Sequence, residues 1–467
     1  MNYQHPGVYI EEIPKFPPSI AAVETAIPVF IGYTEKITNS LDESLLLRPI
    51  HITSLLEYEN LFGYAAPETG IKVEVRTKSD GSTDIIPKLA AQERRPYNMY
   101  YSLQLFYGNG GGDCYIISVG DYTNGAIEKT ALLDGLEASD QQDEITLIVF
   151  PDAQNLPSTV DYYDVYKQAL DKCAGLKDRF TVMDVYKVVS DTANLTEYID
   201  TNIQALRNAG LGEIDTLKYG AAYFPNLNTS LDFAYDEATV DVTGVGALAE
   251  LKSSNNALYF RVKSAIQQMP VEMPPSGAVV GIYASVDNSR GVWKAPANVN
   301  IDFVIGPVID ITDKRQDGLN VDPVAGKSVN VIRSFRGRGP ALIWGARTLA
   351  GNDNEWRYVP VRRFFIMVEE SAKNAAFQFV FEPNDTNTWV RVRSMIENFL
   401  VQQWKAGALM GTTAQQAFYV RVGLNETMSA IDILEGRMNV EIGMAVVRPA
   451  EFIILKFSHK MPEVSAA

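Results

Sequence analysis

The chain has 467 residues, of which 46% are hydrophobic and 21% charged, and its formal net charge is −16. The length predicts two or three domains with a sizeable buried core, and the composition excludes a largely disordered protein. The acidic balance argues against a general nucleic-acid-binding protein, because such proteins neutralise phosphates with a basic surface.

The charge is distributed unevenly along the chain. From residue 331 to the end there are 16 Lys and Arg against 13 Asp and Glu, a net of +3, which leaves −19 for residues 1–330. We therefore expect the C-terminal part to meet an acidic partner. No stretch approaches the roughly 20 apolar residues that span a membrane, and the N-terminus has no secretory signal pattern. We expect a protein made and kept in the cytoplasm unless a whole assembly is released by other means, and no membrane insertion by this chain.

The first segment, HPGVYIEEIPKFPPSI at residues 5–20, combines strand-forming residues with four prolines. Proline fixes the backbone and removes hydrogen-bond donors, and no partner strand follows at hairpin spacing. The pattern predicts that residues 1–20 form an extended arm that leaves the body.

Short apolar runs typical of buried strands come next. They lie at residues 27–34, 114–119, 145–150, 180–185, 219–224 and 277–286. Between them, one helix pattern opens at the capping pair Ser158 and Asp161 and runs to residue 176, and another covers 195–209. Apolar strands that alternate with helices predict an α/β domain over residues 21–345, around a largely parallel sheet. Two polar stretches poor in strand patterns, 65–96 and 225–275, are predicted to be surface insertions.

The pattern changes in the last third of the chain. A helix is predicted from the N-cap candidate Thr388 to Gly407, with Arg391, Arg393 and Lys405 outside its apolar face. Strand patterns follow at 417–422, 439–447 and 451–457. They predict a small α+β domain over 346–449 and a second arm over 450–467.

Few residues could carry chemistry. Cys114 and Cys173 fall in apolar patterns, which predict small buried side chains rather than a disulfide or a catalytic thiol. The three histidines are scattered, so neither a Ser-His-Asp site nor a zinc site is expected. Asp152 and Asp184 follow buried strands, where α/β enzymes often place catalytic groups, although helix-capping aspartates are commoner there.

Two motifs resemble phosphate-binding loops in part. GNGGGD at 108–113 is followed by a strand pattern rather than a helix, and AGKS at 325–328 lacks the first glycine of the loop. No cofactor is therefore expected. The arginines of the C-terminal half are the clearest charge signal; ion pairs within the subunit would account for roughly half of them, and the others could bind an acidic partner.

Several long motifs occur in the order typical of one family. They are HPGVYIEE at the start, RGVWKAPAN at 290–298, GARTLAGNDNEWRYVPVRR at 345–363, FVFEPNDTNTW at 379–389 and RPAEFIILKF at 448–457. In these motifs the chain resembles the contractile tail sheath proteins of phages and phage-tail-like injection particles. The resemblance implies a structural protein with an α/β domain of subtilisin-like topology but no enzymatic activity, a small C-terminal domain and an extended arm at each end.

The resemblance also implies how subunits join. In sheath proteins the two arms give strands to small sheets in the C-terminal domains of neighbours, a pairing known as β-augmentation. Applied here, the donated strands contain Val8, Tyr9, Ile10, Glu11 and Glu12 at one end and Phe452, Ile453, Ile454, Leu455, Lys456 and Phe457 at the other. The receiving strands would contain Phe418, Tyr419, Val420, Val440, Ile442 and Met444.

Partners and mechanism follow from the same resemblance. The chain is expected to assemble with itself in the bacterial cytoplasm, as a helical sheath around an inner tube with baseplate and terminal cap proteins at its ends. Arg391, Arg393 and Lys405 are the candidate contacts with the tube, and no contact with nucleic acid is expected. A change from an extended to a shorter, wider lattice would drive the tube into a target. The alternative is an oligomeric α/β hydrolase or nucleotide-binding enzyme with swapped ends.

Overall fold

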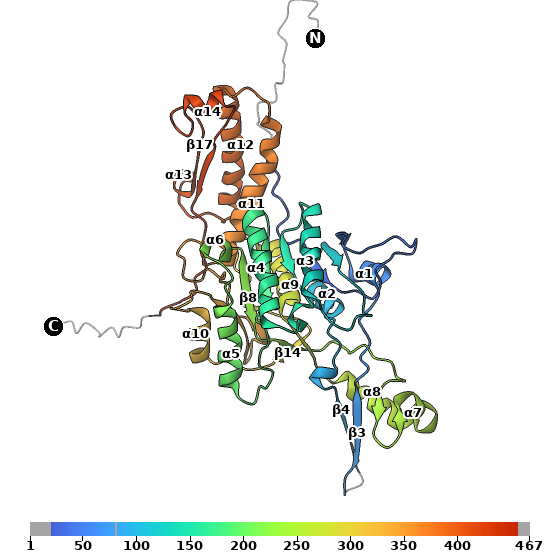
Figure 1. Ribbon diagram of the computed structural model, residues 1–467. Helices are drawn as coiled ribbons and strands as arrows, with labels where there is room; N and C mark the ends of the chain where they lie inside the picture. The colour runs from blue at the N-terminus through green and yellow to red at the C-terminus, as the bar shows by residue number, and fades with distance from the viewer. Residues whose placement is uncertain (1–19, 80–81, 456–467) are drawn as a thin grey trace, which may run out of the picture.

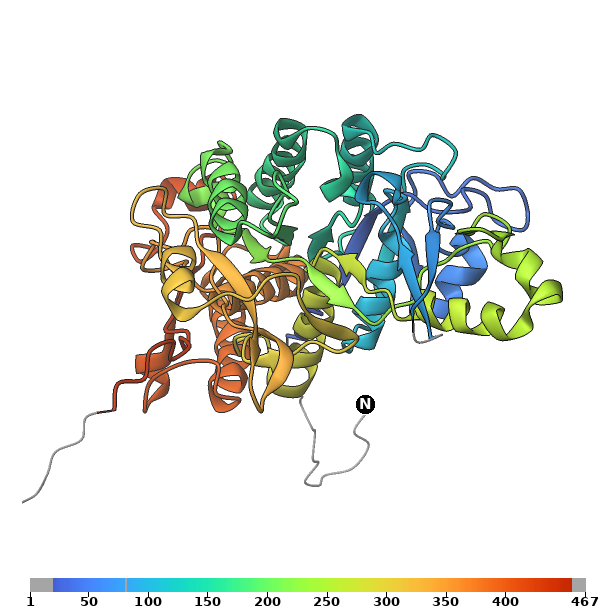
Figure 2. The same cartoon turned by 90° about the horizontal axis from the view of Figure 1, so that it is seen from below.

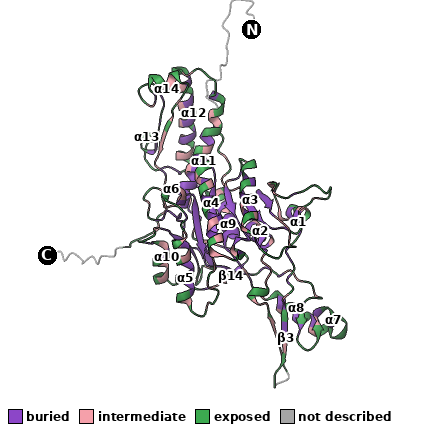
Figure 3. Cartoon of the chain, viewed as in Figure 1, coloured by how far each residue is buried: buried purple, intermediate pink, exposed green. Residues whose placement is uncertain are grey.

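The computed structural model describes residues 20–79 and 82–455 and has a broad α/β body with a narrower helical part above it in Figure 1. Buried side chains concentrate in the central sheet and the helices packed on it (Figure 3). A second, smaller apolar core lies in the helical part. The predicted strand at residues 8–12 lies outside the described residues.

The body is built on a nine-stranded sheet in the order β13-β16-β15-β8-β7-β6-β1-β5-β2. Its six inner strands are parallel: β1 (Pro28–Gly32), β5 (Cys114–Ser118), β6 (Leu147–Val149), β7 (Phe180–Asp184), β8 (Gly220–Phe224) and β15 (Val329–Phe335). Antiparallel strands form its edges: β2 (Ile50–Ile52) on one side, β16 (Gly339–Ile343) and β13 (Val299–Asn300) on the other. Five predicted strands are thus confirmed, and β15 is an inner strand that the sequence patterns did not indicate.

Helices cover both faces of this sheet (Figure 2). On one face lie α3 (Lys129–Ala138), α4 (Thr159–Leu176) and α5 (Leu195–Asn208); on the other lie α2 (Met99–Gly108) and α9 (Ser276–Arg290). The start of α4 is as predicted, because Ser158 Oγ accepts a hydrogen bond from the backbone N–H of Asp161. The mixed α/β class predicted from the alternation is therefore confirmed.

The strand predicted at residues 277–286 is wrong, since this segment forms the buried helix α9. A fully buried apolar run carries no periodicity that separates a helix from a strand. Glycines one turn apart let α9 lie directly against α2: a Cβ added at Gly281 would be 2.5 Å from the backbone oxygen of Phe106. Close packing of two helix backbones, rather than a sheet, accounts for this small-residue pattern.

The two predicted insertions come together in space. β3 (Lys72–Thr77) and β4 (Thr83–Lys88) from the first join β10 (Asp241–Val242) and β11 (Gly246–Ala247) from the second in a four-stranded sheet, beside α7 (Leu248–Ser254) and α8 (Asn256–Gln267). This unit projects from the body on the side away from the helical part (Figure 1). Their sequences show few strand patterns, yet β3 and β4 form a regular hairpin that packs on α8.

The helical part contains two long antiparallel helices, α11 (Val359–Ala376) and α12 (Thr386–Lys405), and a two-stranded sheet of β17 (Phe418–Arg421) and β18 (Glu441–Met444). Its core includes Phe364, Met395 and Phe399. The N-cap of α12 is Asp385 rather than Thr388, because the Asp385 carboxylate accepts from the backbone N–H of Thr388 at 3.0 Å. The cap thus lies three residues before the position expected.

Shorter elements complete the chain. They are α1 (Leu55–Phe62), α6 (Ile214–Leu217), α10 (Asp313–Asn320), α13 (Ala414–Ala417), α14 (Ala430–Leu434) and a small sheet of β12 (Val271–Met273), β9 (Leu227–Thr229) and β14 (Val304–Pro307). Among the helices that the structure describes, none combines the length and the apolar character needed to cross a membrane.

Candidate functional site

The two aspartates considered as catalytic candidates are buried helix caps. Asp184 accepts hydrogen bonds from the backbone N–H and the hydroxyl of Ser276, at 2.8 and 2.7 Å, at the first residue of α9. Asp152 accepts from the backbone N–H groups of Tyr33 and Asn98, the latter just before α2. Burial raises the pKa of both carboxyls to about 7. Asp184 therefore holds the start of α9 and Asp152 the start of α2. Neither aspartate caps the helix that follows it in the sequence.

The other chemical candidates are also structural. Both cysteines are buried, and burial raises the pKa of each thiol to about 12, which disfavours the reactive thiolate. The GNGGGD motif forms the turn between α2 and β5. Within residues 20–79 and 82–455, no group of His, Cys, Asp and Glu is arranged to hold a metal ion.

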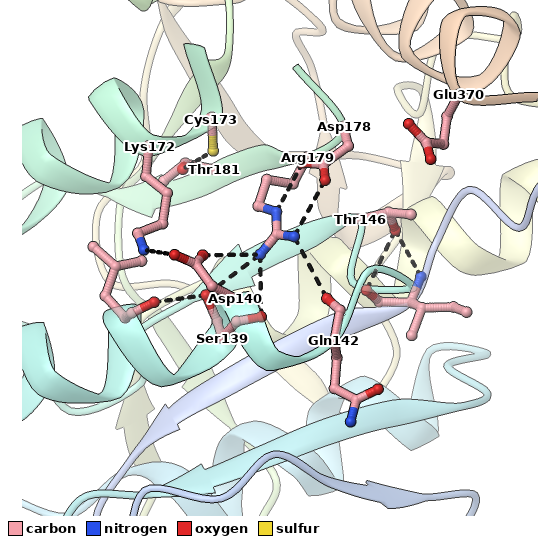
Figure 4. A network of polar contacts seen from close by, with 12 residues as sticks. Ser139, Asp140, Gln142, Thr146, Lys172, Cys173, Asp178, Arg179, Thr181 and Glu370 are labelled. Atoms are coloured by element: carbon pink, nitrogen blue, oxygen red, sulfur yellow. Dashed lines mark hydrogen bonds and ion pairs between the residues drawn. The ribbon is translucent and has the colours of Figure 1, made fainter. Parts of the chain in front are cut away.

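A buried arginine lies directly before the inner strand β7 and organises the contacts there (Figure 4). The guanidinium of Arg179, 1% exposed, contacts both carboxylate oxygens of Asp178 and the backbone oxygens of Ser139 and Gln142. Asp140 beside it pairs with Lys172 of α4 at 2.7 Å. These contacts tie β7 to the α3–β6 connection, so the network stabilises the body and leaves no cation free.

The root of the C-terminal arm is held by one carboxylate. Glu451 receives Arg347 through two hydrogen bonds of 2.9 and 2.5 Å, Asn320 at 2.9 Å and the hydroxyl of Tyr358 at 3.2 Å. The side chains of Arg347 and Glu451 are 4% and 20% exposed. Burial alone would raise the pKa of Glu451, but the hydrogen bonds from Arg347 and Asn320 outweigh it, so its pKa is lowered. We call these four residues the Glu451 clamp.

Beyond the clamp the chain is apolar and exposed. Residues 452–455 are Phe, Ile, Ile and Leu, between 70% and 80% exposed, and they belong to no strand of the subunit. Four adjacent exposed apolar side chains are unusual on an isolated protein and are typical of a surface that another chain covers. The predicted donors Lys456 and Phe457 lie outside the described residues.

The first described residues, which follow the predicted N-terminal arm, are anchored on the helical part. Ile20 is buried in the smaller core, and the backbone N–H of Val23 donates to Ser371 Oγ of α11 at 3.0 Å. Arg363 of α11 ties this segment to the body, since it pairs with the buried Asp287 at 2.6 Å and donates to the backbone oxygen of Thr25. The predicted donors Val8, Tyr9, Ile10, Glu11 and Glu12 lie outside the described residues.

The predicted receiving strands exist and pair with each other. Tyr419 lies opposite Gly443 and Val420 opposite Ile442 in an antiparallel ladder. Phe418 and Met444 pair at its end, and Val440 directly precedes β18. In the part of the chain that the structure describes, neither β17 nor β18 joins a third strand of a sheet, although an isolated bridge pairs Leu409 with Val446 just beyond β18. An unpaired strand edge can accept a strand from another chain.

The charged residues of α12 lie outside its apolar face, as predicted, but two are engaged within the subunit. Arg391, 54% exposed, pairs with Glu382 at 3.4 Å, and Arg393 pairs with Glu426 at 2.8 Å. Lys405 is exposed at the last residue of the helix.

Sequence reasoning missed the Glu451 clamp, although Arg347 and Glu451 fall inside two of the motifs noted above.

Comparison with known proteins gives one consistent answer. A family model described as the phage tail sheath C-terminal domain matches residues 351–460. A curated tail sheath protein of Vibrio phage KVP40 is 25% identical over 194 residues, which are 40% of this chain, and the match spans about a quarter (26%) of that relative's length.

Solved structures match almost the whole chain. A chain of the anti-feeding prophage helical sheath in its contracted state is 30% identical with a TM-score of 0.65, and the match covers 97% of this chain and 99% of that one. A chain of the six-fold symmetrised anti-feeding prophage baseplate has the same identity and TM-score, and the match covers 98% of this chain and 100% of that one. A chain of the PVC sheath complex, an extracellular contractile injection system in its contracted state, is 29% identical with a TM-score of 0.65, covering 98% of this chain and 99% of its own.

Proposed function

This chain belongs to the contractile tail sheath protein family, and from that premise we propose that it is the repeating subunit of a helical sheath that shortens and drives an inner tube into a target. It is a structural protein of a phage or phage-tail-like contractile particle. We assign it no catalytic step.

We propose that neighbouring subunits are joined by donated strands. Residues 452–457 would add to the open edge of the β17–β18 sheet of one neighbour, and residues 8–12 would add to that of another. The observation that carries this proposal is the exposed apolar segment 452–455, which follows the Glu451 clamp and joins no strand of its own subunit. Main-chain hydrogen bonds would bind the donated strand to the neighbour's sheet, and its alternate side chains would fix the register of the pairing.

We propose that each segment of the chain has a separate role in the assembly. Residues 1–20 and 450–467 are the arms, residues 346–449 are the domain that receives strands, and residues 21–345 form an α/β domain of subtilisin-like topology. Bending of the arms while the strands stay paired would let the domains move as rigid bodies between an extended and a shorter lattice. Even about 1 kcal/mol released per subunit would sum to a large driving force over many copies.

The proposed partners are the chain itself, an inner tube protein, and baseplate and terminal cap proteins. A similar chain occurs in a baseplate as well as in a sheath, which supports association with both. Arg391, Arg393 and Lys405 are the proposed tube contacts. Assembly would take place in the bacterial cytoplasm, without contact to nucleic acid or insertion into a membrane.

Two truncations test the strand exchange. Chains lacking residues 1–14 or 452–467 should keep the melting temperature of the full chain to within about 2 °C, since both segments are proposed to pair in a neighbour rather than in their own core, but should form no sheaths in negative-stain images. A truncated chain that unfolds far below the parent would show that the segment belongs to its own core. Regular sheaths from either truncation would remove that arm from the assembly mechanism.

A further inference from the structure

The motif RGVWKAPAN at residues 290–298 forms part of a groove that also contains Phe452 and Ile453, from the segment proposed above to be donated. The groove has a volume of about 1020 Å³ and runs between the start of α11, the wall formed by α10 and the root of the C-terminal arm. Four aromatic side chains line it: Trp293, Trp344, Tyr358 and Phe452. It therefore has the size and the apolar walls to take an extended segment of another chain.

The groove also carries unpaired positive charge. Arg290, Lys294 and Arg448 line it, and among the described residues none of them forms an ion pair. Burial and the neighbouring charge of Arg290 lower the pKa of Lys294, which reflects the crowding of like charges. Such a cluster is complementary to an acidic segment.

The carboxylates in the groove do not cancel this charge. Asp313 pairs with Arg333 at 2.6 Å, and Glu451 is engaged by Arg347. Asp317 is the one lining carboxylate with no ion pair among the described residues. Once these pairs are set aside, three cations face one anion, so the open part of the groove is positively charged.

We infer that this groove binds the acidic pair Glu11 and Glu12 in the N-terminal arm of a second copy of the chain. This inference rests on the proposed strand exchange and names side-chain contacts that would accompany it. The segment VYIEEIP combines two adjacent carboxylates with apolar residues on both sides. It matches a groove that combines cations with aromatic walls, and ion pairs of this kind fix register as well as affinity.

The direction of the chain favours a second copy over the subunit's own arm. The described chain begins at Ile20 and packs near Ser371, towards the C-terminal end of α11, whereas the groove lies at Tyr358, at its N-terminal end. Thirteen helical residues separate the two positions, about 20 Å. To reach its own groove the arm would have to reverse its direction within the eight residues before Ile20.

A charge swap tests the contact. Arg290 and Arg448 are exposed, so the double variant R290E/R448E should fold normally but need an about tenfold higher protein concentration for half-maximal sheath formation, measured by sedimentation. The variant E11R/E12R should show the same loss, and the chain carrying all four changes should return to within about twofold of the parent. Lys252, an exposed lysine of α7 outside the groove, supplies the control variant K252E.

Several outcomes would overturn the inference. If R290E/R448E forms sheaths at the same protein concentration as K252E, the groove lies outside any interface. If the chain carrying all four changes forms sheaths no more readily than either double variant, Glu11 and Glu12 do not bind in the groove. Slower hydrogen exchange in the groove of the full-length monomer than in the monomer lacking residues 1–14 would assign the groove to the subunit's own arm. Sheath formation by the chain lacking residues 1–14 would instead refute the strand exchange itself, so the two failures are distinguishable.

Discussion

The Glu451 clamp makes a sharp prediction, because one substitution removes its charge without changing its shape. In Glu451→Gln the side chain still fits and its amide oxygen can still accept one hydrogen bond. The guanidinium of Arg347, 4% exposed, nevertheless loses its anion; its other acceptors are the backbone oxygens of Asn320 and Gly351 at 3.4 and 3.3 Å. Hydrogen bonds to charged groups contribute about 1.5–3 kcal/mol each, and breaking a fully buried ion pair costs about 3–5 kcal/mol. Since Glu451 is one-fifth exposed, we expect a loss of about 2–3 kcal/mol for the closed clamp.

Hydrogen exchange at Val447 measures this loss. Its backbone N–H donates to the Ala408 oxygen at 3.0 Å, four residues before the clamp, so opening of the arm root exposes it. A loss of 2–3 kcal/mol raises the open population, and hence the exchange rate of this amide, by about 30- to 150-fold. The β17–β18 amides should change much less.

A second ion pair gives a matched control. Asp313 binds Arg333 at 2.6 Å but is 91% exposed, so Asp313→Asn should leave the Val447 exchange rate unchanged. Because the pKa of Glu451 is lowered on folding, its contribution is present at neutral pH and lost as the pH falls through that lowered value, and the Gln variant should lack this dependence. An exchange rate in Glu451→Gln within about threefold of the parent would refute the reasoning.

Three further predictions concern the body and the tube contact. Gly281→Ala should destabilise the protein by about 1–3 kcal/mol, because the added methyl group meets the backbone of α2, whereas Gly318→Ala in α10, with open space around it, should be neutral or stabilising; thermal melts compare the two. Asp184 has a folded pKa of about 7, above that of an ordinary aspartate, so its contribution to stability is full at low pH and is lost as the pH rises towards 7. Asp184→Asn should therefore flatten part of the fall in melting temperature between about pH 4 and pH 7, and an unchanged slope would contradict the assigned pKa. Reversal of Arg391 or Arg393 to Glu should weaken co-sedimentation with the inner tube, and added salt should weaken co-sedimentation of the parent in the same way. Co-sedimentation unaffected by either reversal would exclude both residues from the interface.

The sequence predicted the parallel sheet well for a physical reason. Inner strands of such a sheet are buried on both faces, so each appears as a continuous apolar run, as in Ile116 or Ile148 and their neighbours. The same signal misled at Gly281, because a helix enclosed on all sides is equally apolar throughout. The four-stranded sheet formed by the two insertions was not predicted, because each insertion contributes only two of its strands. Its pairing of Val73 with Val242 joins residues 169 positions apart.

The candidate interface was predictable only in part. The exposed apolar segment after Glu451 and the two resident strands are local patterns, and the sequence shows them directly. The clamp joins residues 104 positions apart, and neither Arg347 nor Glu451 differs from an ordinary surface charge until the fold brings them together. The cationic groove is likewise assembled from four separate segments, within 290–298, 313–321, 333–358 and 447–453, so composition alone could not locate it.

The two arm roots also define a mechanical path through the subunit. Tyr358, at one end of α11, binds Glu451 of the C-terminal root, and Ser371, near the other end, binds Val23 of the N-terminal root. If neighbours pull on both arms, the tension crosses each subunit along about 20 Å of one helix, whose hydrogen bonds lie parallel to the load, and bypasses the nine-stranded sheet. A net built from such links would resist stretching while its α/β bodies swing around it, so tensile strength and change of diameter would be carried by separate parts of the same chain.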